Sequence, residues 1–140
     1  MTKNYKILTS YIKDISSKIT NTESYIYLKE NIPKYSLGID INSIPLKNNM
    51  AEVNVKLNFS NKNEIEQKAF FEMTHSTVVR VDESAVNKDD LKKIFLSEVP
   101  TEMYPEIEKK FFEIVKSIGY PNIKLEKRID FKDLFEKNQK

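Results

Sequence analysis

The sequence has no cysteine and only two glycines, and these absences exclude several kinds of catalytic site. Without cysteine the chain has no disulfide, no thiolate metal ligand and no thiol nucleophile, and its composition suits a reducing compartment. A nucleophile elbow and a phosphate-binding loop each need clustered glycines, which Gly38 and Gly119 cannot supply. Cysteine-dependent enzymes and P-loop nucleotide-binding proteins are therefore excluded.

Histidine is scarce as well, since His75 is the only one in the chain. A zinc site needs several His, Cys or carboxylate ligands close together. His75 shares the alternation register of Met73 and Val79, so we expect a buried, hydrogen-bonded or interface histidine rather than a catalytic or metal-binding one. Paired carboxylates occur at 64 and 66 and at 89 and 90, in turns or a first helical turn, where solvation or the helix dipole explains them. We predict a protein that is not an enzyme and has no catalytic residue, metal or cofactor.

Long apolar runs are absent too. No stretch approaches the apolar core of a signal peptide or the ~20 residues of a membrane span, so we expect a cytoplasmic protein without membrane insertion.

The net charge of +2 arises from 23 basic and 21 acidic residues spread along the chain, whereas a nucleic-acid binder concentrates its basic residues. The 140 residues suit one domain, 1–140, and no nucleic-acid partner is predicted.

The sequence does contain alternation of period two, which predicts β-strands over the first ~80 residues. Residues 35–41 alternate apolar and polar side chains. After Pro45 and the turn-prone 47–49, the alternation resumes over 53–59, which predicts an antiparallel hairpin. A second polar turn at 60–63 leads to a long predicted strand that ends at Val81 and has mostly apolar odd positions.

From Asn87 the period changes to that of helices. Asn87 caps a predicted helix that Pro100 ends. Pro105 begins a second predicted helix, which Gly119 stops through a left-handed conformation. The apolar stripe of this second helix consists of Ile107, Phe111, Ile114, Val115 and Ile118. Asp130 is predicted to cap a last helical turn.

Strands come first and helices last, so the predicted class is α+β with an antiparallel sheet. A sheet of about four strands under two helices is a small framework for this much apolar surface, and long strands leave edges that pair with other chains. We therefore expect an oligomer.

Several segments, in this order and spacing, resemble the SecB family of protein-export chaperones from about Tyr11 to Phe135. They are 11–16, 69–72, the junction between Pro100 and Pro105, and the tail segments 119–125 and 130–135. The resemblance implies a four-stranded antiparallel sheet with helices packed on one face, dimers that extend the sheet, and a homotetramer built as a dimer of dimers. It also implies an ATP-independent holdase that keeps unfolded precursor proteins export-competent and delivers them to the translocation motor SecA.

In this family the C-terminal tail of SecA docks on the outer face of the sheet, and the resemblance implies docking contacts at Asp14, Phe70 and Glu72. Periodicity independently places Phe70 on the outer face beside Glu72. An exposed aromatic next to a carboxylate suits a basic tail with apolar anchors, while packing across strands or in a subunit contact explains it equally well. The chain departs from the family at Lys18, where a second acidic docking residue is usual, and in lacking an acidic C-terminal tail.

Client binding needs extended apolar surface that accepts many sequences. The candidates are Tyr35, Leu37, Ile39, Ile44 and Phe112. The core or a subunit interface explains each of them better than client binding does, and the sequence alone does not separate these uses.

Two functional hypotheses follow. The first is a general export holdase that works with SecA. The second is a SecB-like chaperone dedicated to one partner, such as the antitoxin of a toxin-antitoxin system, which Lys18 and the missing acidic tail favour. A nucleic-acid-binding module is the contrasting class, and the balanced charge disfavours it.

Overall fold

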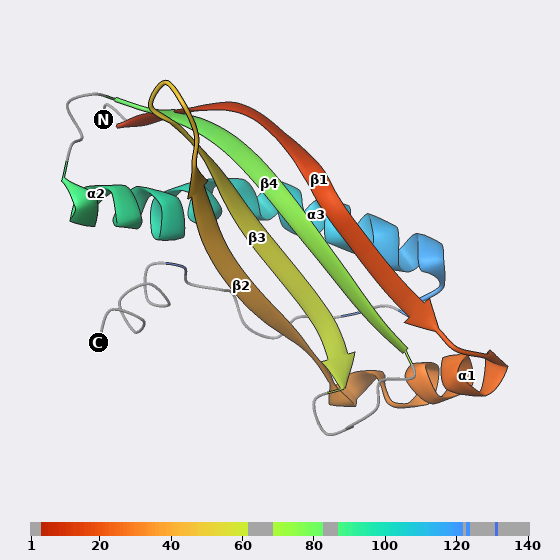
Figure 1. Ribbon diagram of the computed structural model, residues 1–140. Helices are drawn as coiled ribbons and strands as arrows, with labels where there is room; N and C mark the ends of the chain where they lie inside the picture. The colour runs from red at the N-terminus through yellow and green to blue at the C-terminus, as the bar shows by residue number, and fades with distance from the viewer. Residues whose placement is uncertain (1–3, 62–68, 83–86, 122, 124–130, 132–140) are drawn as a thin grey trace.

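The computed structural model describes residues 4–61, 69–82, 87–121, 123 and 131 (Figure 1). Its centre is a four-stranded antiparallel sheet with strand order β1-β4-β3-β2. The strands are β1 (Tyr5–Ile19), β2 (Tyr35–Pro45), β3 (Met50–Asn61) and β4 (Ala69–Val81). Helix α3 (Val99–Ile118) runs behind the sheet (Figure 1). The predicted α+β class, with a four-stranded antiparallel sheet and helices on one face, is confirmed.

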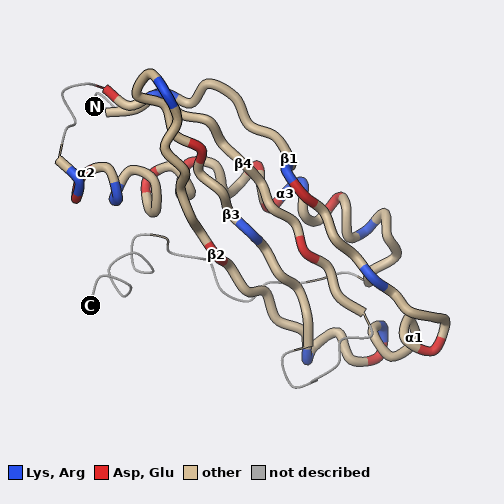
Figure 2. The backbone as a smooth tube through the Cα atoms, in the orientation of Figure 1, with Lys and Arg blue, Asp and Glu red and all other residues tan. Residues whose placement is uncertain are grey.

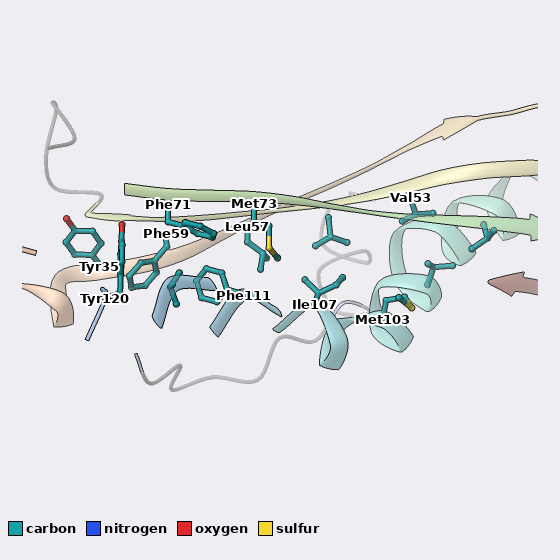
Figure 3. Close-up of a cluster of buried hydrophobic side chains, with 14 of the residues drawn as sticks. Tyr35, Val53, Leu57, Phe59, Phe71, Met73, Met103, Ile107, Phe111 and Tyr120 are labelled. Atoms are coloured by element: carbon teal, nitrogen blue, oxygen red, sulfur yellow. The ribbon is translucent and has the colours of Figure 1, made fainter. Parts of the chain in front are cut away.

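The core lies between the two central strands and α3, and we call this side of the sheet the inner face. Phe59 pairs with Phe71 across β3 and β4, and both side chains are buried. The Phe111 ring of α3 packs against both, with centroid distances of 6.1 Å to Phe59 and 5.6 Å to Phe71 (Figure 3). These three rings form the aromatic centre of the core, since edge-to-face contacts add to the burial of large apolar side chains.

The prediction that the first ~80 residues form strands only is wrong at α1 (Thr22–Glu30), which a 3₁₀ helix, Ile32–Lys34, follows. Asn21 caps α1 by accepting a hydrogen bond from the backbone N–H of Ser24 at 2.9 Å. The helix buries only Ser24 and Leu28. Such a short helix with one buried apolar side chain leaves almost no helical periodicity to read in the sequence.

The predicted break between two helices is also wrong. The segment runs without interruption from α2 (Lys88–Lys93) through a π-helix, Ile94–Glu98, into α3. Pro100 lies in the first turn of α3 and Pro105 lies inside it. The π-turn widens the helix directly before Pro100, with the Val99 N–H donating to the Ile94 carbonyl five residues back. A proline without an N–H is accommodated there, and Pro105 removes one further backbone hydrogen bond without ending the helix.

Other local predictions are confirmed. Asn87 caps α2 through a 2.9 Å hydrogen bond from the Asp89 N–H. Gly119 ends α3 in the left-handed region at φ 117°. Asn48 and Asn49 have φ values of 62° and 61°, which is the conformation of a two-residue hairpin turn between β2 and β3.

Three predictions fall partly or wholly outside the described residues. The polar turn predicted at 60–63 is wrong for Ser60 and Asn61, because both belong to β3. The start of the predicted long strand before Ala69, the Asp130 cap and most of the last helical turn lie in segments that the structure does not describe.

Candidate binding surfaces on the two faces of the sheet

The inner face is fully buried only along its two central strands. In one register row, Met73 of β4 and Leu57 of β3 are inaccessible to solvent, whereas Ile15 of β1 is 46% exposed and Ile39 of β2 is partly buried. The helix layer therefore leaves apolar flanks at both edges of the sheet. Exposed apolar flanks of this kind are typical of surfaces that contact other protein chains.

The structure brings the predicted docking residues together on the opposite, outer face. Lys18 is the cross-strand partner of Phe70, and Asp14 is that of Thr74, with Glu72 between Phe70 and Thr74 along β4. Phe70 and Glu72 are both partly buried. We call Asp14, Lys18, Phe70 and Glu72 the docking patch. Their placement agrees with the period-two expectation, while their role in docking stays a prediction.

Lys56, which sequence reasoning missed, contributes to the charge of the docking patch. Glu72 accepts a hydrogen bond from the Asn58 amide, and its Oε2 lies 3.8 Å from Nζ of Lys56. Lys56 faces Thr74 across the strands, so Glu72 has a cation on the β3 side, and Lys18 adds a second cation on β1. The patch is therefore mixed in charge rather than acidic. Alternation assigns Lys56 to the outer face, but its register against Glu72 is long-range information that alternation does not contain.

The five predicted client-binding residues do not form one surface. Tyr35 belongs to the core, because its ring packs 5.3 Å from Phe59 and its hydroxyl donates to the Ala69 carbonyl at 3.0 Å. Leu37 and Ile39 are partly buried on the inner flank of β2. Their shared face follows from their spacing of two residues on one strand.

The remaining two client-binding candidates lie elsewhere. Phe112 is partly buried on α3, with its ring 5.5 Å from Phe111. Ile44 is 43% exposed and pairs with Glu52, so it faces the outer side of the sheet, away from Ile39. An even position on β2 points away from the odd ones, which explains the separation.

His75 is buried, as predicted, on the inner face opposite Ile12. Its Nε2 lies 3.1 Å from Nζ of Lys110 on α3 and accepts a hydrogen bond from that ammonium group. Burial lowers the pKa of His75 to about 4, and the positive charge of Lys110 is the second cause of this shift. The negative charge of Glu106 opposes the shift more weakly. The histidine is therefore neutral at physiological pH. Within the described ranges, no group of three or more His, Asp or Glu side chains is placed to hold a metal ion.

The outer face also holds a buried polar network that sequence reasoning missed. Glu52 is only 8% exposed, and it accepts hydrogen bonds from the Tyr11 hydroxyl at 2.9 Å and from Nζ of Lys13 at 3.0 Å. Asn54, which also contacts Glu52, receives a hydrogen bond from Ser76. The bond from Lys13, then those from Tyr11 and Asn54, lower the pKa of Glu52, so the carboxylate stays charged. Tyr11 and Glu52 lie on strands separated by β4, which is why no local pattern reveals the network.

The arrangement of strands and helices matches a known chaperone fold. The SecB-like chaperone of Mycobacterium tuberculosis, in complex with a ChAD peptide from the HigA1 antitoxin, superposes with a TM-score of 0.65. The match covers 90% of this chain and 91% of the other at 10% sequence identity, so it establishes the shared fold alone. The chain therefore has a SecB-like fold.

Sequence comparison gives the family. The chain matches the family of the preprotein translocase subunit SecB over residues 1–140. A protein of Pelagibacter ubique that carries the SecB name is 46% identical over 136 residues, covering 97% of both chains. The protein-export protein SecB of Mesorhizobium japonicum is 24% identical over 132 residues, covering 93% of this chain and 76% of that one.

The chain belongs to the SecB family. It is a protein-export chaperone of a family that binds unfolded client proteins, and it is not an enzyme. Among the described residues, no helix is both long enough and apolar enough to cross a membrane.

Proposed function

We propose that this chain is an ATP-independent holdase that binds unfolded precursor proteins in the cytoplasm, keeps them export-competent and delivers them to SecA. Its chaperone domain spans 1–140. The observation that carries the proposal is the pair of apolar flanks at the edges of the inner face, where Ile15 is 46% exposed and Ile39 is partly buried. Unfolded chains share exposed apolar side chains and free backbone groups. An apolar flank contacts the former, and the strand edge beside it pairs with the latter.

Two separate surfaces are the client-binding candidates, namely the β2 flank with Leu37 and Ile39, and Phe112 on α3. The holdase is tested by light scattering of an aggregating unfolded protein without ATP. The wild type suppresses aggregation, and Ile39→Asp weakens this suppression because a charge in the apolar flank must be desolvated when a client binds. Ile26→Asp, on the exposed side of α1, is the matched control. Failure of the wild type at stoichiometric amounts would end the holdase proposal.

SecA docks on Asp14, Phe70 and Glu72. Support comes from their common position on the outer face and from the partial exposure of Phe70 beside two carboxylates. A pulldown with the C-terminal tail of SecA tests this contact, with Glu72→Lys as the comparison. No binding by the wild type would remove SecA as the partner and leave the holdase activity standing.

A second candidate function is protection of one dedicated partner, such as an antitoxin. The mixed charge of the docking patch favours it, because Lys18 and Lys56 weaken attraction for a basic tail. Adjacent genes that encode a toxin and an antitoxin, together with binding of that antitoxin and no general holdase activity, would reverse the ranking.

The active assembly is a homotetramer made of two dimers. The long edge strand β1, with its apolar inner flank, supports dimerisation by sheet extension. Light scattering coupled to size exclusion gives the mass directly, and a mass of four 16.5 kDa chains is expected. A monomer at micromolar concentration would contradict the assembly.

A further inference from the structure

Large exposed hydrophobic side chains gather near one end of the sheet. Six are exposed among the described residues, and they are Leu8, Tyr11, Ile15, Ile26, Ile44 and Leu46. Leu8, Ile44 and Leu46 belong to the end of the sheet where β1 starts and the β2–β3 hairpin turns (Figure 1), and Tyr11 lies further along β1, opposite Ser76. We call these four, with the partly buried Val78, the hairpin patch. Clustered exposed apolar residues mark interaction surfaces, whereas scattered ones need no explanation.

The strand register makes the patch continuous. Val78 pairs with Thr9 on one side and with Glu52 on the other, and Glu52 pairs with Ile44. Leu8 is the extra residue of a β-bulge next to Thr9. Leu46 lies beside Met50, because its N–H donates to the Met50 carbonyl at 2.8 Å. The patch therefore extends across all four strands.

Tyr11 gives the patch a rigid aromatic centre. Its cross-strand partner is Ser76, which is fully buried, and its hydroxyl bonds to Glu52 on the strand beyond. The ring must therefore extend across β4 above the small Ser76 side chain. Glu52 is itself fixed by Lys13 and Asn54, so Tyr11 is held at both ends and still 44% exposed. Little side-chain entropy remains to be lost when a partner contacts such a ring.

Charge identifies the kind of partner. Lys6 and Arg80 face each other at this end of the sheet, and Lys47 lies in the hairpin turn, all three exposed. Figure 2 shows basic positions in blue at this end. Asp82 is the neighbouring acid, and Glu52 is already paired with Lys13. The rim is thus net basic around an apolar centre. Anionic membranes are typically held by clusters of about four to eight basic residues, more than this rim offers.

We propose that the hairpin patch binds a short segment of a partner protein that combines apolar and acidic side chains. The hairpin patch shares no residue with the docking patch, and the two are nearest at Tyr11 and Asp14, whose β4 partners Ser76 and Thr74 are two positions apart. Val78 and Phe70 are eight positions apart on β4, which corresponds to roughly 26 Å along a strand.

Binding is measured by fluorescence anisotropy of a labelled peptide of alternating leucine and glutamate, with a leucine–lysine peptide as the charge control. The acidic peptide binds the wild type, and Leu46→Asp weakens binding by about tenfold or more. Tyr11→Phe, which keeps the ring and removes its bond to Glu52, weakens it less. Ile26→Asp, an equal change on α1, leaves binding unchanged. Leu46→Asp also leaves aggregation suppression unchanged, which separates this proposal from the holdase.

Several outcomes overturn the proposal. One is equal binding of the lysine peptide, and another is loss of peptide binding in Ile39→Asp but not in Leu46→Asp. A third is binding to vesicles of phosphatidylcholine and phosphatidylserine that Leu46→Asp abolishes while no peptide binds. Self-association that Leu46→Asp abolishes, again without peptide binding, would assign the patch to a second copy of this chain. Thermal unfolding followed by circular dichroism verifies that each variant is folded.

Discussion

The two faces of the sheet bury side chains in different ways. On the inner face, α3 covers Phe59 and Phe71, and their burial depends on apolar contact with another layer. On the outer face, Glu52 and Asn54 are buried by neighbouring side chains of the sheet itself, through hydrogen bonds. Apolar burial is non-directional, whereas a hydrogen-bonded network loses stability when any one partner is removed. The inner face should therefore dominate stability, and the outer face should be sensitive to geometry and charge.

The strongest test compares two adjacent phenylalanines on opposite faces. Phe71→Ala should lower the free energy of unfolding by about 3–5 kcal/mol, because it opens a cavity beside Phe111. Phe70→Ala should cost much less, since Phe70 is only partly buried. Urea denaturation of both variants gives the difference. Equal losses would show that the outer face is as tightly packed as the inner one.

A pH experiment examines the one histidine of the inner face. The pKa of His75 is about 4 in the folded protein and near its ordinary value of 6.5 when unfolded, so the unfolded chain binds the proton between these values. Stability should therefore fall as pH drops from 6.5 to 4, by about 2 kcal/mol from this group.

The matched variant is His75→Leu, because the chain has no other histidine. Denaturation at pH 7 and pH 4.5 should show a smaller loss for the variant than for the wild type. The carboxylates titrate in both proteins, and their contribution cancels in the comparison. Parallel losses in the two proteins would mean that His75 is protonated as readily when folded as when unfolded.

The network of the outer face gives a smaller effect. Glu52→Ala leaves the buried Asn54 amide without one acceptor and frees the Tyr11 hydroxyl, at a cost of about 1–2 kcal/mol. Glu72→Ala is the control, because its carboxylate is more exposed and its ion pair with Lys56 is long. Chemical denaturation measures both, and an equal cost for the two carboxylates would contradict a special role of the network.

The smallest expected effect concerns charge on the docking patch. Lys18→Glu should tighten binding of the SecA tail by about threefold to tenfold, because it replaces a repelling charge next to Phe70 with an attracting one. Lys92→Glu makes the same change of net charge on α2, at the opposite end of the sheet (Figure 1), and should have little effect. Titration calorimetry at low and high salt checks both. Unchanged affinity in Lys18→Glu would argue against a docked basic tail.

Periodicity predicted the architecture well where the alternation of side chains alone determines the structure. Alternation identified the strands around Ile39 and Leu57 and the face of Phe70, since period two follows directly from strand geometry. Helix α1 was missed because Leu28 is its one buried apolar residue. Pro100 was read as a stop, whereas the π-turn before it allows the helix to continue.

The candidate sites were less predictable, because they depend on register between distant segments. The contact of Tyr11 with Glu52 across β4, and that of Lys56 with Glu72, need the pairing of three strands to be known. Ile44 was grouped with Ile39 as a client-binding residue, although one extra residue of spacing places it on the other face. The face to which a strand side chain points follows from its position in the local sequence, whereas its neighbours on adjacent strands depend on the register between distant segments.

The strand order also bears on how the chaperone is made. β1 is synthesised first, yet it pairs only with β4, and Tyr5 meets Val81. During translation this long strand, with Ile12 and Ile15 on one side, remains without its partner until β4 has left the ribosome. Contacts between such distant segments slow folding and expose unpaired strands to aggregation. The first strand of this chaperone is therefore unpaired, and open to aggregation, from its own synthesis until Val81 has been made.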